Sequence, residues 1–223
     1  MGDRPHVLLS CAMSVDGYID DASPERLLLS NDEDFDRVDG ERAACDAILV
    51  GANTIRRDNP RLLVRSKARR ADRAIRGLPE NPVKVTLTRS GNLDPTARFF
   101  TAGDSPRLVY CPTSVTEKLT EQLADLATVI DAGDPLTLES VLRDLAHRGV
   151  QRLMVEGGST IHTQFLTEGL ADELRLAIAP FFVGDHTAAR FVGPGEFPQN
   201  PANRMRLSGV RPIGDVVLVH YEL

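Results

Sequence analysis

The chain has 223 residues, of which 42% are hydrophobic and 26% are charged, and its formal net charge is −6 at pH 7. This length and composition are typical of one folded domain, and the negative charge argues against a general nucleic-acid binder. No apolar run approaches the ~20 residues that a membrane-spanning helix needs. The charged N-terminal segment 1–5 does not resemble a signal peptide. We therefore expect a cytoplasmic protein that binds neither nucleic acid nor membrane.

Cysteines and histidines give no sign of a metal or nucleophile chemistry. Cys11, Cys45 and Cys111 lie far apart in apolar segments, so we expect buried structural thiols and no disulfide or zinc pattern. The five histidines are scattered, and no metal site is predicted. The motifs of zinc deaminases and serine hydrolases are missing. A reduction in which a nicotinamide carries the hydride would need none of these groups.

Strand-like and helix-like segments alternate along the chain. Two helix starts have the spacing of a capping box, Ser30 with Glu33 and Ser114 with Glu117. A further helix from about Thr137 places apolar residues on one face and stops at Gly149. A fourth is expected over 159–166, and the expected strands are 7–13, 47–50, 83–88, 108–111, 128–130, 151–155 and 173–179.

The C-terminal segment departs from this alternation. Two strand-like runs, 206–210 and 216–222, flank a Pro-Ile-Gly-Asp turn, which predicts an antiparallel hairpin over about 205–223. Repeated strand–helix units predict a mainly parallel sheet covered on both faces. The expected fold class is therefore a three-layer α/β/α domain over 1–223, with an antiparallel hairpin at its end.

Two segments are expected to be irregular. Residues 61–76 hold seven basic side chains and one acid, which is typical of a solvated loop, and residues 184–203 are rich in Gly and Pro. Both are predicted to lie on the surface.

Two strand-to-helix junctions carry glycine and hydroxyl side chains, where ligands bind in open α/β sheets. One is 49–54, with Gly51 and Thr54, and the other is 155–160, with Gly157 and Gly158. Glycine allows close approach of a ligand, and exposed N–H groups favour phosphate. Each junction alone is more typical of a tight turn with an N-cap, since neither matches a Rossmann or P-loop pattern. The two together make a dinucleotide site and a pair of tight turns equally well supported.

Between the junctions, 56–62 holds Asp58, Asn59 and three arginines. Asn before Pro is a turn signal, although the arginines could also bind a phosphorylated substrate. The Asp-Gly pair in 14–17, at the end of the first strand, is by itself only a turn signal.

The ordered set of motifs resembles the pyrimidine reductases of riboflavin biosynthesis, which share the dihydrofolate-reductase-like fold. The resemblance covers almost the whole chain and rests on ordered pieces. These are Ala12-Met13-Ser14-Val15-Asp16-Gly17, Arg42-Ala43, Asp46 to Gly51, Thr54, Asp58-Asn59-Pro60, Leu62, Val155-Glu156-Gly157-Gly158, Leu170 to Leu174, Ala179-Pro180 and Gly184.

The resemblance implies NADPH-dependent reduction of the ribosyl group of an aminopyrimidine ribose phosphate to ribityl, with hydride going to C1′ of the opened sugar. It implies substrate contacts from Arg26, Arg42, Asn59, Leu62, Arg65 and Glu156, with Arg42 and Arg65 on the phosphate. Asp58 or Glu156 could supply the proton if a raised pKa kept it protonated. The implied NADPH contacts are Ala12, Leu28, Gly51, Thr54, Asp58, Arg89, Gly157, Gly158, Ser159, Thr160, Ile161 and His162.

Two positions depart from the family pattern. Ser10 stands where the family often has a lysine, and Arg26 stands where a small polar residue is expected. An NADPH reductase of a pterin, folate or specialised metabolite, and a non-catalytic nucleotide-binding protein, therefore stay open as alternatives. Whether the pyrimidine is deaminated before reduction is open too. Relatives commonly pair, and the hairpin edge needs protection, so a homodimer is expected.

Overall fold

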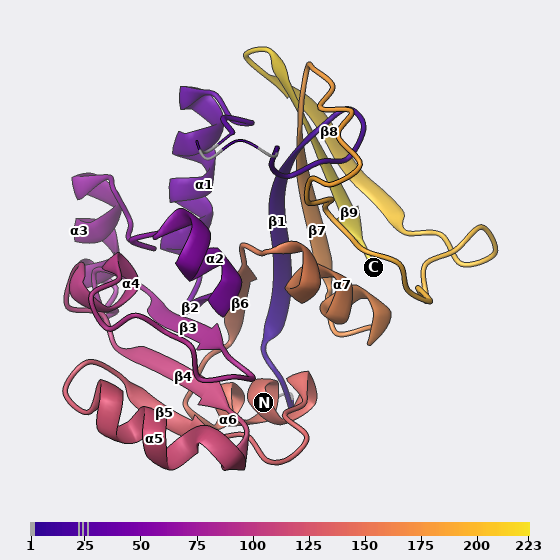
Figure 1. Cartoon of the computed structure of the whole chain (residues 1–223). Helices are drawn as coiled ribbons and strands as arrows, with labels where there is room; N and C mark the ends of the chain where they lie inside the picture. The colour runs from indigo at the N-terminus through magenta and orange to yellow at the C-terminus, as the bar shows by residue number, and fades with distance from the viewer. Residues whose placement is uncertain (1–2, 22, 24, 26) are drawn as a thin grey trace. The chain divides into compact units, whose positions relative to one another are not determined.

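A computed structural model describes residues 3–21, 23, 25 and 27–223 of the chain. The described residues divide into two compact units. Unit 1 comprises Met1–His6 and Asp39–Met154, and unit 2 comprises Val7–Val38 and Val155–Leu223. Figure 1 labels the elements of both.

Unit 1 is built on parallel strands that are apolar on both faces. The pairs β2–β3, β3–β4 and β4–β5 are all parallel, and every residue of β2 is buried. Continuous apolar runs of this kind are typical of strands covered on both sides. The strand order is β5-β4-β3-β2-β6. The bounds are β2 (Ala47–Gly51), β3 (Val83–Leu87), β4 (Arg107–Cys111), β5 (Thr128–Asp131) and β6 (Arg152–Val155, whose last residue belongs to unit 2).

Five helices of unit 1 connect these strands. α6 shows the local rules most plainly: the Thr137 side chain accepts a hydrogen bond from the Ser140 N–H, and Gly149 follows the helix with a φ of +86°. Four apolar residues spaced at helical period are buried on its inner face. The bounds are α2 (Ala52–Asp58), α3 (Lys67–Ile75), α4 (Arg98–Thr101), α5 (Thr113–Leu123) and α6 (Leu138–His147).

Unit 2 combines one parallel pair with an antiparallel hairpin. β1 (His6–Ser14, whose first residue belongs to unit 1) pairs in parallel with β7 (Glu173–Ala179). β9 (Val216–Glu222) then pairs antiparallel with both β7 and β8 (Arg206–Ile213), giving the order β1-β7-β9-β8. In Figure 1 these strands lie side by side.

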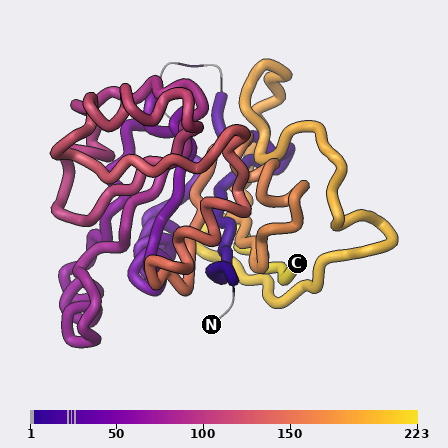
Figure 2. The backbone as a smooth tube through the Cα atoms, turned by 90° about the horizontal axis from the view of Figure 1, so that it is seen from below, coloured from indigo at the N-terminus to yellow at the C-terminus, as the bar shows by residue number. Residues whose placement is uncertain are grey.

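Two helices complete the fold. α7 (Ser159–Thr167) belongs to unit 2, whereas α1 (Asp32–Ala44) begins in unit 2 and continues into unit 1. The connection from β7 to β8 forms no helix or strand over 184–203, as expected, and Figure 2 shows it as an open loop.

The alternation of strands and helices, the mainly parallel pairing and the C-terminal hairpin confirm the predicted elements. Cys45 and Cys111 are buried as expected, and Cys11 is half-buried. The predicted cap of α1 was wrong by one residue. The helix begins at Asp32, and Asn31 rather than Ser30 caps it by accepting a hydrogen bond from the Asp34 N–H at 2.9 Å.

Two further expectations are corrected. The basic segment 61–76, expected to be a loop, contains α3, which Ser66 caps and whose Arg73 is buried. The Arg73 side chain donates to the carbonyls of Ala43, Cys45 and Pro79, so tertiary hydrogen bonds hold a helix that composition alone disfavours. α5 begins at Thr113 after Pro112, with no side-chain cap, instead of at a Ser114 capping box.

Candidate active site

In unit 2, β1 ends in a turn organised by one carboxylate. Ser14 Oγ donates to Asp16 Oδ1 at 2.5 Å, and the N–H groups of Val183 and Gly184 donate to Asp16 at 3.1 and 2.8 Å. Desolvation raises the pKa of Asp16, but these three hydrogen bonds outweigh it and leave the pKa below its usual value. Asp16 therefore ties the turn after β1 to the segment after β7. The predicted cofactor residue Ala12 is half-buried on the strand that this turn closes.

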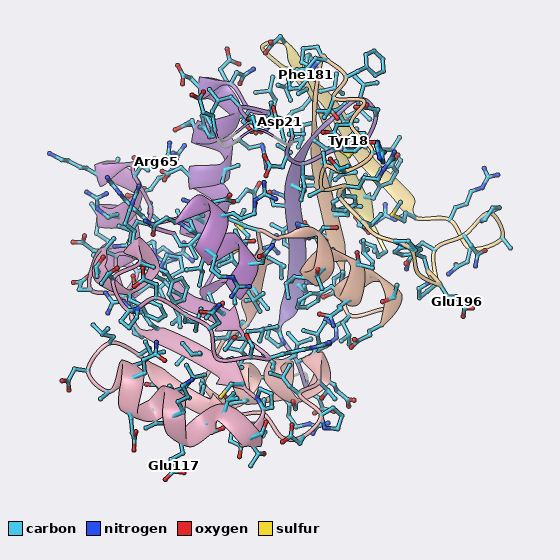
Figure 3. All side chains as sticks on the ribbon, in the orientation of Figure 1. Tyr18, Asp21, Arg65, Glu117, Phe181 and Glu196 are labelled. Atoms are coloured by element: carbon cyan, nitrogen blue, oxygen red, sulfur yellow. The ribbon has the colours of Figure 1, made fainter. Side chains whose placement is uncertain are left out.

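A second set of contacts fastens the same turn. Arg190 packs over the Tyr18 ring at 4.4 Å and donates to its hydroxyl at 2.8 Å, while the Val15 N–H donates to the Phe181 carbonyl at 2.9 Å. Tyr18 and Phe181 are labelled near the same end of unit 2 in Figure 3. The turn after β1 is thus held by contacts with two segments distant in sequence, one at Phe181 and one at Arg190.

The predicted dinucleotide junction of unit 2 is a glycine loop that leads into α7. Gly157 has a φ of +119°, and a Cβ there would lie 3.3 Å from Nε2 of His162. Gly158 is the N-cap residue of α7, and no side chain caps the helix there. The first N–H groups of the helix are therefore suited to a phosphate. Ser159 is half-buried and Thr160 exposed at this helix start, while Ile161 is buried. A glycine loop that leads into an uncapped helix start is the arrangement expected at a dinucleotide phosphate.

His162, predicted at the cofactor, has a fully buried side chain. Burial lowers the pKa of His162 to about 4, so the imidazole is neutral near pH 7. Neither ring nitrogen has a hydrogen-bond partner among the residues that the structure describes, and the ring centroid lies 5.2 Å from that of Phe191. The imidazole lies against Gly157 and so packs beneath the glycine loop.

The remaining predicted residues of unit 2 differ in exposure. Leu28 is 67% exposed, although its neighbour Leu29 is buried. Glu156 is half-buried directly after β6. Arg26 lies outside the described residues.

In unit 1, the first junction runs from Gly51 into α2. Gly51 is buried and is the N-cap residue of α2, where no side chain caps the helix. Thr54 is half-buried in the first turn. Asp58 is exposed at the last turn. Asn59 follows with a φ of +44°, and its side-chain oxygen accepts a hydrogen bond from the Arg98 N–H at 2.6 Å. The Asn59 side chain thus holds the start of α4.

The segment 62–66 of unit 1 carries Leu62 and Arg65, and several side chains hold its backbone by hydrogen bonds. Asp39 accepts hydrogen bonds from the N–H groups of Arg65 and Ser66, and Arg69 also donates to it at 2.9 Å. Arg42, one turn further along α1, donates to the Leu63 carbonyl at 3.2 Å. Leu62 is buried with a φ of +49°. Arg65 itself is exposed beside the start of α3 (Figure 3).

Asp39 was not singled out in the sequence, although it organises this segment. Desolvation raises the pKa of its carboxyl, and the hydrogen bonds from Arg65, Ser66 and Arg69 bring the pKa below its usual value. Asn81 and Arg70 complete the support, binding the N–H and carbonyl of Val64 at 2.9 and 2.8 Å. One acidic residue among the many charged residues of α1 gives no signal of such a role before the contacts are known.

Arg89 is exposed after the end of β3. Thr88 Oγ1, just before it, accepts a hydrogen bond from the Gly91 N–H at 3.1 Å and shapes the turn. The contact of Arg89 with the phosphate that distinguishes NADPH from NADH stays a prediction.

Within unit 1, a hydrogen bond connects Arg42 to the segment that carries Leu62 and Arg65. Within unit 2, the predicted cofactor residues 157–162 form one continuous loop and helix start. Across the described parts of the chain, no three His, Cys, Asp or Glu side chains gather in a way that could hold a metal ion. No helix among the described residues is long and apolar enough to cross a bilayer.

Comparisons with known proteins agree with this arrangement. The family described as the RibD C-terminal domain matches residues 5–219. The 2,5-diamino-6-ribosylamino-4(3H)-pyrimidinone 5′-phosphate reductase of Methanothermobacter thermautotrophicus is 36% identical over 98% of this chain and 98% of that protein.

Solved structures give the same grouping. The RibD structure of Acinetobacter baumannii (form 2) aligns with a TM-score of 0.80 and 26% identity, covering 99% of this chain; the chain spans 58% of the length of that RibD. A dihydrofolate reductase of Enterococcus faecalis, solved with NADP(H), aligns with a TM-score of 0.53 over 97% of this chain and 95% of that one, at 13% identity. The fold is therefore shared with dihydrofolate reductase.

Proposed function

Because the chain belongs to the RibD C-terminal domain family, we propose that it reduces the ribosyl group of a phosphoribosylamino-pyrimidine to a ribitylamino group in riboflavin biosynthesis, with NADPH as the reductant. The observation that carries the proposal is the end-to-end match to a curated pyrimidinone phosphate reductase. It supports a single reductase domain over 1–223.

The chain offers residues that suit NADPH. The glycine loop Gly157-Gly158 and the uncapped start of α7 suit a pyrophosphate, and a Cβ at Gly157 would press against the buried His162 ring and distort the loop. Ala12, Leu28, Thr54 and Asp58 are the further contacts that we assign, with Arg89 on the 2′-phosphate. When bound, NADPH supplies the hydride that reduces C1′ of the opened sugar.

The substrate phosphate is assigned to unit 1. Arg65 extends from a segment whose backbone Asp39 and Arg42 fix, and a fixed backbone reduces the ordering cost of binding. An arginine fork matches phosphate geometry. Arg42 is accordingly both a predicted phosphate contact and a support of this segment. We assign further substrate contacts to Asn59, Leu62, Glu156 and Arg26.

Reduction at C1′ also requires a proton. Glu156 and Asp58 are the two carboxyl groups that we assign as candidate donors, directly or through water. Glu156 is the half-buried one of the two, and Asp58 is exposed. Replacing each by its amide tests the assignment: the donor's variant loses kcat with little change in KM.

A cytoplasmic homodimer is part of the proposal. β8 is the outer strand in the order of unit 2, and Leu207 and Val210 on it are 55% and 58% exposed. An unpaired apolar edge of this kind favours pairing with a second copy. Light scattering on the wild type and on Val210→Lys would show a dimer that the substitution weakens; a monomeric wild type contradicts this part.

The decisive test follows NADPH oxidation with the aminopyrimidine ribosyl phosphates, with dihydrofolate in parallel. We expect turnover of a ribosyl phosphate, and a loss of about 100-fold in kcat/KM in Arg65→Ala, which is on the order of 2.7 kcal/mol. Arg76→Ala, an exposed arginine at the other end of α3, is the matched control. Turnover of dihydrofolate alone would move the protein to the pterin and folate reductases, and tight NADPH binding without turnover of either kind of substrate would contradict the proposed substrate.

A further inference from the structure

Lys84 on β3 is a buried lysine that none of the assigned contacts uses. Its side chain is 0% exposed, whereas lysine is almost never fully buried unless its ammonium group is paired. Burial, together with the charge of Arg107, lowers the pKa of Lys84 to about 8, and the charge of Asp104 opposes this change. Lys84 is therefore mostly protonated at pH 7 and places a cation in the interior of unit 1.

Backbone carbonyls at the end of α4 receive this cation. Lys84 Nζ donates to the carbonyl of Phe99 at 3.1 Å and to the carbonyl of Ala102 at 2.5 Å, and Ala102 is the C-cap residue of α4. The last carbonyls of a helix have no partner within the helix, and a lysine side chain can supply one. Lys84 therefore fastens the end of α4 to the sheet.

The helix α4 depends on such support because it is only one turn long. It comprises four residues, and a helix of this length is held by tertiary contacts more than by its own hydrogen bonds. Phe99 and Phe100 are buried in the same apolar cluster as Ile55 and Leu62. Apolar packing and the hydrogen bonds from Lys84 thus hold α4 together.

Both ends of α4 contact the segment 59–63, which follows α2. At the start of α4, the Arg98 N–H donates to Asn59 Oδ1 at 2.6 Å. Just past its end, Gly103 lies so close to Leu63 that a Cβ on Gly103 would be 2.8 Å from Leu63 Cδ2. A displacement of α4 would therefore reach this segment at two points.

Three of the assigned substrate contacts depend on the same segment. Asn59 accepts from α4 through Oδ1, and this hydrogen bond orients Nδ2, the only donor group of the side chain. Leu62 lies within the segment and has a φ of +49°. The Leu63 carbonyl accepts the hydrogen bond from Arg42 at 3.2 Å, so this backbone orients Arg42 as well. The position of α4 therefore determines where these groups meet a substrate.

We infer that Lys84 is a positioning residue for substrate binding: it fixes α4, and α4 fixes the segment 59–63. This segment carries Asn59 and Leu62 and orients Arg42. Because its side chain is fully buried, Lys84 acts through α4 and not by contact with the substrate. The inference rests on the proposed function for the roles of the three contacts in substrate binding.

Lys84→Met tests this role, because methionine is a flexible side chain of similar length that donates no hydrogen bond. We expect KM for the ribosyl phosphate to rise about 10-fold, with kcat and KM for NADPH within about 2-fold. The cofactor is affected little because most of its assigned contacts lie in unit 2. Lys118→Met, at an exposed position of α5, is the matched control and should change none of these values. An unchanged KM for the ribosyl phosphate, or an equal rise in KM for both ligands, would overturn the inference.

Amide hydrogen exchange measured by NMR separates this inference from the proposed function. In Lys84→Met the Arg98 amide should exchange at least about 10-fold faster than in the wild type, because its acceptor on Asn59 is no longer held in place. Amides of α5 should be unchanged. Unaltered exchange at Arg98 would overturn the inference. Absence of NADPH oxidation by the wild type with any ribosyl phosphate would instead overturn the proposed function.

Gly103→Ala provides a second test if Lys84→Met does not fold. The added Cβ would displace Leu63 at the far end of α4 and leave Lys84 in place. We expect KM for the ribosyl phosphate to rise about 3-fold, with kcat unchanged. Gly77→Ala is the matched control, because Gly77 has a φ of +74°, close to the +69° of Gly103, and nothing lies within 4 Å of its added Cβ. Equal KM values in the two variants would overturn the inference.

Discussion

The segment 62–66 of unit 1 and the Asp34–Arg37 pair of unit 2 treat buried polar groups in opposite ways. Around 62–66 the protein supplies the partners itself, with Asp39, Arg42, Asn81 and Arg70 binding successive backbone groups. Arg37 Nε donates to Asp34 Oδ1 at 2.7 Å, but the other carboxylate oxygen of Asp34 and Nη1 of Arg37 are buried without a hydrogen-bond partner among the described residues. The first arrangement fixes a backbone from which Arg65 extends. The second keeps two buried polar atoms unpaired at a cost in free energy.

His162 shows the cost of leaving a buried group unpaired, and it gives the largest expected effect. Its pKa is about 4 when folded and about 6.5 when unfolded, so the unfolded state binds the proton first as pH falls. The free energy of unfolding should therefore be lost between pH 6.5 and 4, by on the order of 3 kcal/mol. Chemical denaturation of wild type and His162→Leu across this range checks the prediction.

The stability of the wild type should fall more steeply with acid than that of His162→Leu, since only the wild type carries this buried imidazole. Parallel stability curves would mean that His162 is not a buried neutral group in the folded protein.

Gly157→Ala tests whether the glycine loop depends on close approach. Its φ of +119° disfavours any side chain, and the new Cβ would lie 3.3 Å from the His162 ring. We expect NADPH binding to weaken about 100-fold, or on the order of 2.7 kcal/mol, as measured by fluorescence titration. Gly149→Ala is the control, because Gly149 also has a positive φ but nothing lies within 4 Å of its added Cβ. Equal NADPH affinity in the two variants would refute the role of the loop.

Asp39→Asn should have a smaller and more selective effect. The amide keeps the shape of the Asp39 carboxylate but loses its negative charge, which strengthens the hydrogen bonds from Arg69 and from two backbone N–H groups. Arg65 is therefore held less precisely in position. We expect about a 10-fold rise in KM for the ribosyl phosphate with kcat and the KM for NADPH unchanged, or about 1.4 kcal/mol.

The Asp39→Asn effect should vanish in an Arg65→Ala background, because residues that act through one contact are not additive. Losses that add in the double variant would show that Asp39 supports the fold and not the phosphate contact.

The sequence predicted those parts of the fold that local rules decide. The cap of α6 at Thr137, the glycine after it and the hairpin of β8 and β9 follow from short-range signals. α3 could not be predicted from local signals. Its Arg69 binds Asp39, and its Arg73 donates to three backbone carbonyls, two of which are distant in sequence. α1 was placed too early because Ser30 and Asn31 are both good caps, and only contact with the β8–β9 turn selects Asn31.

The candidate site divides in the same way. The glycine loop at Gly157 could be predicted because glycine after a buried strand is a local signal of close approach. Asp39 is different, because its hydrogen bonds to the N–H groups of Arg65 and Ser66 join positions far apart in the sequence, and no spacing on α1 reveals them.

The most direct test of the central claim follows the hydride itself. NADPH deuterated at C4 of the nicotinamide, in the transferable position, is incubated with the protein and an aminopyrimidine ribosyl phosphate, and the product is examined by mass spectrometry and NMR. We predict a ribityl product that carries one deuterium at C1′. Deuterium in the pyrimidine ring, or an unreduced ribosyl group after NADPH has been oxidised, would contradict the account.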